Sequence, residues 1–240
     1  MNSDVYSSGK KAVTKVASVT RSTVGGKLVM VNTVNGDVSS LGKKGKTLVA
    51  SIDRSQIDGN ATLLNTVIGD TTNKGKKATV KVASISDSNI DGNLVMNTRF
   101  TGNAYASGKK SSILVNSIDN SNIGGNAVIV SNINGDLINK GKKSSMNVSS
   151  VKNSDISGNL VMNTYLGDGA YIKGKKSHMT IGGVSDSNIN GNAVLNTYVG
   201  GNVYSKKKKA LTVIGGVVDS NINANVSLNT AVHGLSLIHI

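Results

Sequence analysis

The sequence predicts an all-β protein, a β-solenoid (β-helix-like) of seven 33-residue repeats in which each repeat forms one broad coil. Three observations predict this fold. A Gly-Lys-Lys motif recurs at a constant spacing without insertion or deletion, apolar residues recur in fixed columns, and Gly- and Asn-rich turn signals separate those columns. Strict repeat length is typical of coils that stack on their neighbours.

The Gly-Lys-Lys motif sets the repeat boundaries. Residues 1–8 form a partial repeat, and residues 9–234 hold seven repeats, of which the last is incomplete. The repeats start at Gly9, Gly42, Gly75, Gly108, Gly141, Gly174 and Lys207. Because Met1 falls on an apolar column in the middle of a repeat, we expect the chain to be an interior fragment of a longer protein.

The repeat pattern stops at residue 235. Residues 235–240, Leu-Ser-Leu-Ile-His-Ile, correspond to the translated end of a transposon adapter used in sequencing libraries. We therefore interpret them as a sequencing-adapter artefact on a gene fragment from an environmental assembly, and exclude them from functional reasoning. The alternative is a short natural apolar tail.

Five columns are apolar in every repeat and predict the core. They begin at Val16, Val19, Val24, Met30 and Val34 and recur once in each following repeat. Most of their members are β-branched, and the apolar runs are only a few residues long, which favours short strands over helices.

Turn signals predict three corners in each coil. Asp58-Gly59-Asn60 marks one corner, Asn35-Gly36-Asp37 marks another, and the Gly-Lys-Lys segment makes the third. Gly and Asn accept the positive φ angles that tight corners need. Such dipeptides also form β-hairpins, so an antiparallel β-hairpin array is the alternative fold, and two narrow coils per repeat is a further one.

The composition argues against a conventional enzyme. The chain has 28 Gly, one Phe and no Pro, Cys or Trp, and aromatic residues make up 3% of it. No thiol can hold a metal or act as a nucleophile, and neither His178 nor His233 has a partner that recurs in the repeats. We therefore expect no catalytic residue, no metal and no cofactor, and no apolar run is long enough to span a membrane.

The net charge of +14 predicts an anionic partner. Paired lysines of the repeat motif form two adjacent columns, and stacking at the β spacing of about 4.8 Å would align them in a basic ridge along one edge. We call this set the lysine ridge, a hypothetical anion-binding site. Its members are Lys10, Lys11, Lys43, Lys44, Lys76, Lys77, Lys109, Lys110, Lys142, Lys143, Lys175, Lys176, Lys208 and Lys209. The alternative role of these lysines is solubility and protection of sheet edges, which needs no ligand.

Polar columns are predicted to be structural. Asparagine recurs in the column that begins at Asn60, and serine recurs in the column that contains Ser55. Such side chains can form hydrogen-bonded ladders along a stack. Tyr6, Tyr105, Tyr171 and Tyr204 share a column beside the lysine ridge, where amphipathic packing on a half-exposed strand is expected.

The repeats, as in Ser-Asn-Ile-Asp-Gly-Asn-Leu-Val-Met-Asn-Thr from Ser88 to Thr98, resemble bacterial secreted β-solenoid repeat proteins, in particular filamentous-haemagglutinin-like adhesins and more loosely curli-type fibre subunits. The resemblance implies an extracellular or cell-surface location. The sequence thus predicts a non-enzymatic structural or adhesive repeat region of a bacterial surface or extracellular filament protein, with possible end-to-end self-association. The alternative is a binding module whose lysine ridge binds an anionic polysaccharide, cell-surface polymer or nucleic acid.

Overall fold

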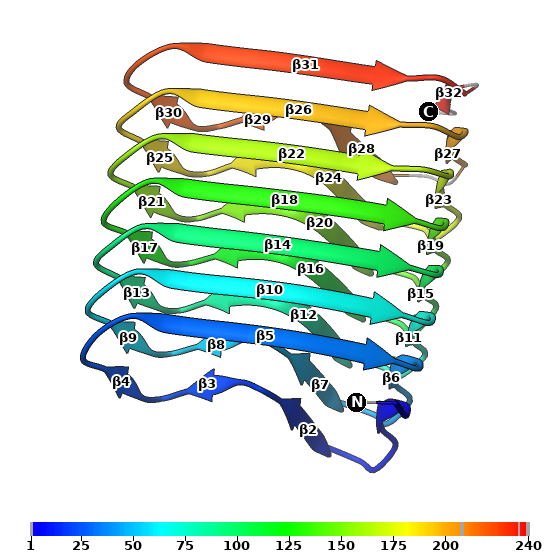
Figure 1. Cartoon of the computed structure of the whole chain (residues 1–240). Helices are drawn as coiled ribbons and strands as arrows, with labels where there is room; N and C mark the ends of the chain where they lie inside the picture. The colour runs from blue at the N-terminus through cyan, green and yellow to red at the C-terminus, as the bar shows by residue number, and fades with distance from the viewer. Residues whose placement is uncertain (1, 207–208, 235, 239–240) are drawn as a thin grey trace.

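The computed structural model describes residues 2–206, 209–234 and 236–238 and shows a β-solenoid of stacked coils. All strand pairs in the described part of the chain are parallel, and they build four sheets that run the length of the stack (Figure 1). No described residue lies in a helix. The predicted all-β solenoid is therefore confirmed, and the antiparallel hairpin array is wrong.

One coil illustrates the path of the chain. In the second coil, β6 (Val38–Ser40) leads through the Gly-Lys-Lys corner into β7 (Lys46–Val49) and β8 (Ile52–Asp53). The chain then turns into β9 (Gln56–Ile57) and returns along β10 (Ala61–Ile68). β11 (Thr71–Asn73) then begins the next coil by pairing with β6, so each repeat closes one coil.

Three of the four sheets contain one strand from each coil, and in two of these the strands are at least three residues long. The short-strand sheet holds β1 (Val5–Ser7), β6, β11, β15 (Ala104–Ala106), β19 (Leu137–Asn139), β23 (Ala170–Ile172), β27 (Val203–Ser205) and β32 (Ser236–Ile238). The long-strand sheet holds β5 (Leu28–Asn35), β10, β14 (Leu94–Thr101), β18 (Ala127–Asn134), β22 (Leu160–Leu166), β26 (Ala193–Val199) and β31 (Val226–Val232). β32 pairs with β27 through its backbone, and this pairing does not test where the sequence comes from. The adapter origin of residues 235–240 therefore stays a prediction.

The other two sheets close the coil. The kinked sheet holds β2 (Val13–Val16), β3 (Val19–Thr20), β7, β8, β12 (Thr79–Ser86), β16 (Ser112–Asp119), β20 (Ser145–Lys152), β24 (His178–Ser185), β28 (Leu211–Ile214) and β29 (Val217–Val218). The two-residue sheet holds β4 (Thr23–Val24), β9, β13 (Asn89–Ile90), β17 (Asn122–Ile123), β21 (Asp155–Ile156), β25 (Asn188–Ile189) and β30 (Asn221–Ile222).

The register places each residue on its equivalent in the next repeat. Leu63 pairs with Met96, and Val82 pairs with Val115, each of them one repeat further along the chain. One broad coil per repeat is thus confirmed, and two narrow coils per repeat are excluded.

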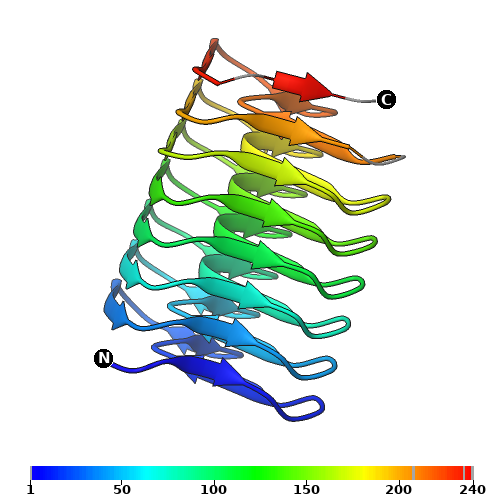
Figure 2. The same ribbon diagram turned by 90° about the vertical axis from the view of Figure 1, so that its right-hand side faces the viewer.

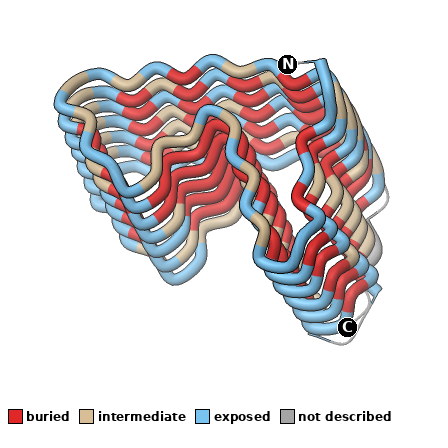
Figure 3. The backbone as a smooth tube through the Cα atoms, turned by 90° about the horizontal axis from the view of Figure 1, so that it is seen from below, coloured by how far each residue is buried: buried red, intermediate tan, exposed pale blue. Residues whose placement is uncertain are grey.

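The interior is divided into two apolar clusters (Figure 3). One cluster contains the columns of Val49 and Val67, and the other contains the columns of Ile52, Ile57 and Leu63. All five predicted columns therefore face the core. The sequence did not predict further inward columns, such as that of Val38 on the short strands.

The prediction of three corners per coil was wrong, because two more bends occur. The kinked sheet turns at Ala50, with φ 47°, and the chain turns again at Arg54, with φ 51°. Equivalent residues adopt the same left-handed conformation in the other described coils, as at Ala83 and Asn116. In the first coils these positions hold alanine or arginine, as at Ala50 and Arg54, and neither residue type carries a turn signal.

Polar ladders hold the corners together. The backbone N–H of Ser55 donates to Oγ of Ser88 (3.1 Å), and the N–H of Asn93 donates to Oδ1 of Asn60 (2.8 Å). The N–H of Asp70 likewise donates to Oδ1 of Asp37 (2.8 Å). The predicted structural role of the Asn and Ser columns is confirmed, and the Asp37 carboxylate takes part in a similar ladder.

Candidate functional site: the lysine ridge

The Gly-Lys-Lys corner joins the short-strand sheet to the kinked sheet. The corners of successive coils project in a row along one edge of the stack (Figure 2). Each corner is tied to the next by its backbone: the N–H of Lys44 donates to the carbonyl of Lys76, and that of Lys77 to the carbonyl of Lys109, both at 2.9 Å. The described lysines of the predicted ridge therefore lie in one line.

Coils approach closely at the corners that begin with Gly42, Gly75, Gly108, Gly141 and Gly174, and glycine fits this approach. A Cβ atom on Gly42 would clash with the carbonyl oxygen of Gly9, and one on Gly75 would clash with that of Gly42. At these corners a larger residue would push successive coils apart.

A buried side chain braces the corner from inside. Asn73 is fully buried, and its amide donates to the carbonyl of Ala78 at 2.9 Å and to that of Ser112 in the next coil at 2.8 Å. Asn139 makes the equivalent pair of contacts two coils further on, with the carbonyls of Ser144 and His178. At these two corners the buried asparagine therefore fixes the loop that carries the lysines.

The second lysine of the motif is held in a left-handed conformation. The φ angle is 56–59° in every copy, at Lys11, Lys44, Lys77, Lys110, Lys143, Lys176 and Lys209. This conformation costs a non-glycine residue about 1 kcal/mol or more, and Gly or Asn would adopt it more readily. The other two left-handed columns contain Ala, Ser, Asn, Asp, Arg or Gly, whereas this column holds lysine throughout. Local conformation therefore does not explain why this column holds lysine. This observation points to the charge of the lysine side chain as the reason.

The ridge lysines are exposed and carry uncompensated charge. All ridge members among the described residues are exposed, and Lys208 lies outside that part of the chain. The two ion pairs found among the described residues both involve Asp53 and no ridge member. Adjacent ammonium groups one coil apart repel by about 1 kcal/mol in water, less when salt screens them.

The tyrosine column lies beside this basic edge. The Lys140 ammonium lies 5.2 Å from the centroid of the Tyr105 ring, and the Lys173 ammonium lies 5.9 Å from that of Tyr171. Lys140 and Lys173 directly precede the motif glycines Gly141 and Gly174. These contacts hold additional cations next to the ridge.

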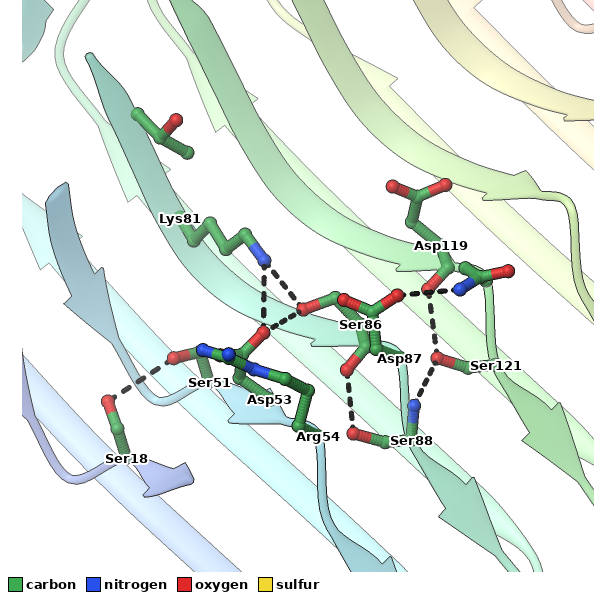
Figure 4. Close-up of polar contacts among 12 residues, drawn as sticks. Ser18, Ser51, Asp53, Arg54, Lys81, Ser86, Asp87, Ser88, Asp119 and Ser121 are labelled. Carbon is green, nitrogen blue, oxygen red and sulfur yellow. Dashed lines mark hydrogen bonds and ion pairs between the residues drawn. The ribbon is translucent and has the colours of Figure 1, made fainter. Parts of the chain in front are cut away.

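Sequence reasoning missed a second charged cluster, on the outer face of the kinked sheet (Figure 4). Arg54 donates to Oδ2 of Asp53 from Nε at 3.2 Å and from a terminal guanidinium nitrogen at 2.9 Å. The Lys81 ammonium lies 3.7 Å from Oδ1 of Asp53 and donates to Oγ of Ser86 at 2.6 Å, and Ser86 donates to Asp53 at 2.8 Å. The columns of these residues change residue type from repeat to repeat, so a search for constant columns could not find the cluster.

Burial and charge shift the pKa values in this cluster. Burial acts to raise the pKa of Asp53, but hydrogen bonds from Ser86 and Arg54 and the charge of Lys81 outweigh it, so its pKa lies below the ordinary 3.8. The pKa of Lys81 is lowered, mainly by burial, with Asp53 opposing the shift. Burial raises the pKa of Asp119, further along the stack. The site therefore holds charges in a partly dehydrated environment.

The described residues offer no group of three or more His, Cys, Asp or Glu side chains that could hold a metal ion. Within the same residues, no helix has the length and hydropathy needed to cross a membrane.

The fold places the chain in the class of parallel β-solenoids built from tandem repeats, here with a basic edge. No protein-family model, curated protein or solved structure matches the chain.

Proposed function

We propose that the chain is a non-enzymatic structural repeat region of a bacterial surface or extracellular filament protein. The observation that carries this proposal is the unbroken register: every coil pairs with the next at a shift of one repeat, from β1 to β31. Function on a repeat fold is carried by a local site, and no described coil is interrupted by an inserted segment that could carry a catalytic one. The surface location is supported by the resemblance of the repeats to secreted β-solenoid adhesins.

The coil surfaces are complementary to one another, so the chain should elongate end to end. In the described part of the chain, β31 has one paired edge and one free edge, and its inward residue Leu228 is 46% exposed. A free parallel edge is a template for another chain with the same register. Electron microscopy of the tag-free chain should show fibrils one coil wide, and growth should increase with salt because salt screens the ridge.

A matched pair of variants tests this growth. Leu228→Lys places a charge on the inward face of the last long strand and should stop elongation. Ser227→Lys, on the outward face of the same strand, adds the same charge and should leave elongation intact. A wild-type chain that stays monomeric at high concentration and high salt would count against a filament role.

A second candidate function is binding of an anionic polymer by the lysine ridge, and it is favoured by the left-handed lysines. Lysine binds as a point charge, so affinity should fall steeply with salt and depend little on polymer sequence. Titrations with a polyuronate and with double-stranded DNA over a salt series measure both properties. Absence of salt-dependent binding would leave the structural role alone.

The ridge can be tested without weakening the fold. Lys110→Asn/Lys143→Asn removes two ridge charges and introduces a residue that prefers the left-handed conformation. We expect weaker polymer binding with unchanged or higher thermal stability. The control Lys27→Asn/Lys152→Asn removes the same charge from exposed positions off the ridge and should retain more of the binding.

A further inference from the structure

The outer surface of the solenoid is hollowed by a groove in its first three coils. Ala17, Ala50 and Ala83 bend the kinked sheet at left-handed residues. On the outer surface, the part of the sheet before the bend therefore faces the part after it. The groove encloses about 350 Å³. Leu48, which is 3% exposed, lines it, and the contact between Lys81 and Ser86 crosses it from one half of the strand to the other.

Cations dominate the lining of this groove. Lys15, Lys46 and Lys81 come from the first half of the kinked strands, and Arg21 and Arg54 come from the bend beyond the second half. Asp53 is the single acidic residue in the lining. Figure 4 shows Arg54 and Lys81 both directed toward this carboxylate.

One carboxylate does not neutralise this set. Of the five cations, Lys15, Arg21 and Lys46 take part in none of the ion pairs found in the described part of the chain. Burial is the main cause that lowers the pKa of Lys81. The charge of Lys46 lowers this pKa further, while the charges of Asp53, Asp119 and Asp87 raise it. The groove therefore has repulsion that a bound anion would relieve.

The charge is local to these coils and is not a property of the repeat. Further along the stack, the column of Lys15 and Lys81 continues with Leu114, Asn147 and Thr180. The column of Lys46 continues with Thr79 and Ser112. Charges that serve solubility alone are spread over a surface, whereas these lysines lie with two arginines on one concave surface.

We propose that this groove is a binding site for a tetrahedral oxyanion, a phosphate or sulfate group carried by a polymer or small molecule. Lys15, Lys46 and Arg21 supply charge that Asp53 does not use. Arg21 supplies a planar guanidinium, which suits oxyanion geometry, whereas Nε and one terminal nitrogen of Arg54 already donate to Asp53. The site is separate from the lysine ridge and does not depend on the role proposed for the ridge.

Titration of the whole chain with inorganic phosphate and, separately, with inorganic sulfate tests the proposal. Binding should shift the methyl resonances of Leu48, which lines the groove, and leave those of Leu195 unchanged. Leu195 is buried in β26, four repeats further along the chain, and is not part of the groove lining. A stronger response to phosphate or to sulfate identifies the ester class. Equal shifts at both leucines, or none at either at millimolar anion, would overturn the proposal.

Charge-matched variants locate the site. Lys15→Gln/Lys46→Gln changes two exposed lysines outside the Asp53 network, so the fold should persist, and we expect a loss of about tenfold in anion affinity. Lys175→Gln/Lys176→Gln removes the same charge from the ridge and should leave the affinity within about twofold. Equal losses in both variants would show an effect of net charge alone and would contradict a groove site.

Discussion

The hydroxyl of Thr98, on the long strand β14, donates a hydrogen bond of 2.7 Å to Oδ1 of Asn116, at the kink of β16. Both residues are fully buried. The Asn116 amide donates in turn to the carbonyl of Val130 at 2.6 Å and to Oγ of Ser131 at 2.8 Å. This contact joins the long-strand sheet to the kinked sheet and fixes the kink of this coil, whereas the coils that form the outer groove have alanine at the equivalent position.

Replacing Asn116 with glycine should destabilise the protein. Gly keeps the left-handed conformation but leaves the buried Thr98 hydroxyl without its acceptor and removes one of the two donors to Ser131, at a cost of about 1–3 kcal/mol. Asn116→Ala should cost about 1 kcal/mol more, because alanine is strained in the left-handed conformation. Urea unfolding of both variants measures these differences. If Asn116→Gly unfolds at the same urea concentration as the wild type, the contact carries no stability.

A double variant separates the lost hydrogen bond from the cavity. Asn116→Ala with Thr98→Val removes the unsatisfied Thr98 hydroxyl, and paired apolar replacements of this kind cost less than a single deletion. The double variant should therefore recover part of the stability that Asn116→Ala loses, while Ser131 keeps its hydrogen bond from Ser149. Further loss on adding Thr98→Val would show that the apolar cavity dominates.

The stacked columns were predictable because they repeat. The members of the Val49 and Ile52 columns keep one residue class in every coil, so the constant repeat length was sufficient to place them in the core. The division into two clusters was not predictable. It depends on the bend at Ala50 and Ala83, and alanine gives no sign of a left-handed conformation in a sequence.

The two candidate sites also differ in how much of each could be predicted from the sequence. The line of ridge lysines followed from the motif, but the left-handed conformation of Lys44 and its equivalents needed the structure. The groove could not be found from the columns. Asp53 and Lys81 belong to columns of mixed residue type, and they meet only because the kinked strand turns back on itself.

A glycine substitution tests how closely the ridge corners pack. Gly108→Ala places a methyl group against the carbonyl oxygen of Gly75 in the preceding coil, and the backbone must shift to admit it. We expect a loss of about 1–3 kcal/mol. The control Gly26→Ala adds a methyl group with no heavy atom within 4 Å and should change the stability by less than about 0.5 kcal/mol. Equal melting temperatures for the two variants would contradict close packing at the ridge.

The Asp53 carboxylate should stabilise the fold in a pH-dependent way. Its pKa is lowered in the folded state, so its contribution is present above the ordinary value of 3.8 and is lost as the pH falls through the lowered value. Asp53→Asn should cost about 1–3 kcal/mol at neutral pH, because Lys81 and Arg54 lose their charged partner. Unfolding measured from pH 7 downward should show the difference from wild type shrinking in acid. A constant difference would mean that the ionised form is unimportant.

Asp119 should show the opposite dependence. Burial raises its pKa above 3.8, with the charges of Lys152 and Lys81 opposing the rise, so the folded chain keeps the proton more strongly than the unfolded chain does. Stability is therefore lost as the pH rises through the raised value. Asp119→Asn should be more stable than wild type at neutral pH, by no more than about 1 kcal/mol because the side chain keeps part of its hydration. The gain should vanish near pH 3.8.

Lys152 provides the control for this last prediction. Its charge holds down the pKa of Asp119, so Lys152→Met should raise that pKa further and increase the cost of ionising the carboxyl group. The stabilisation by Asp119→Asn should then be larger in the Lys152→Met background than in the wild type, as measured by a double-mutant cycle at neutral pH. A smaller gain in that background would show that the charge of Lys152 does not favour ionisation of Asp119.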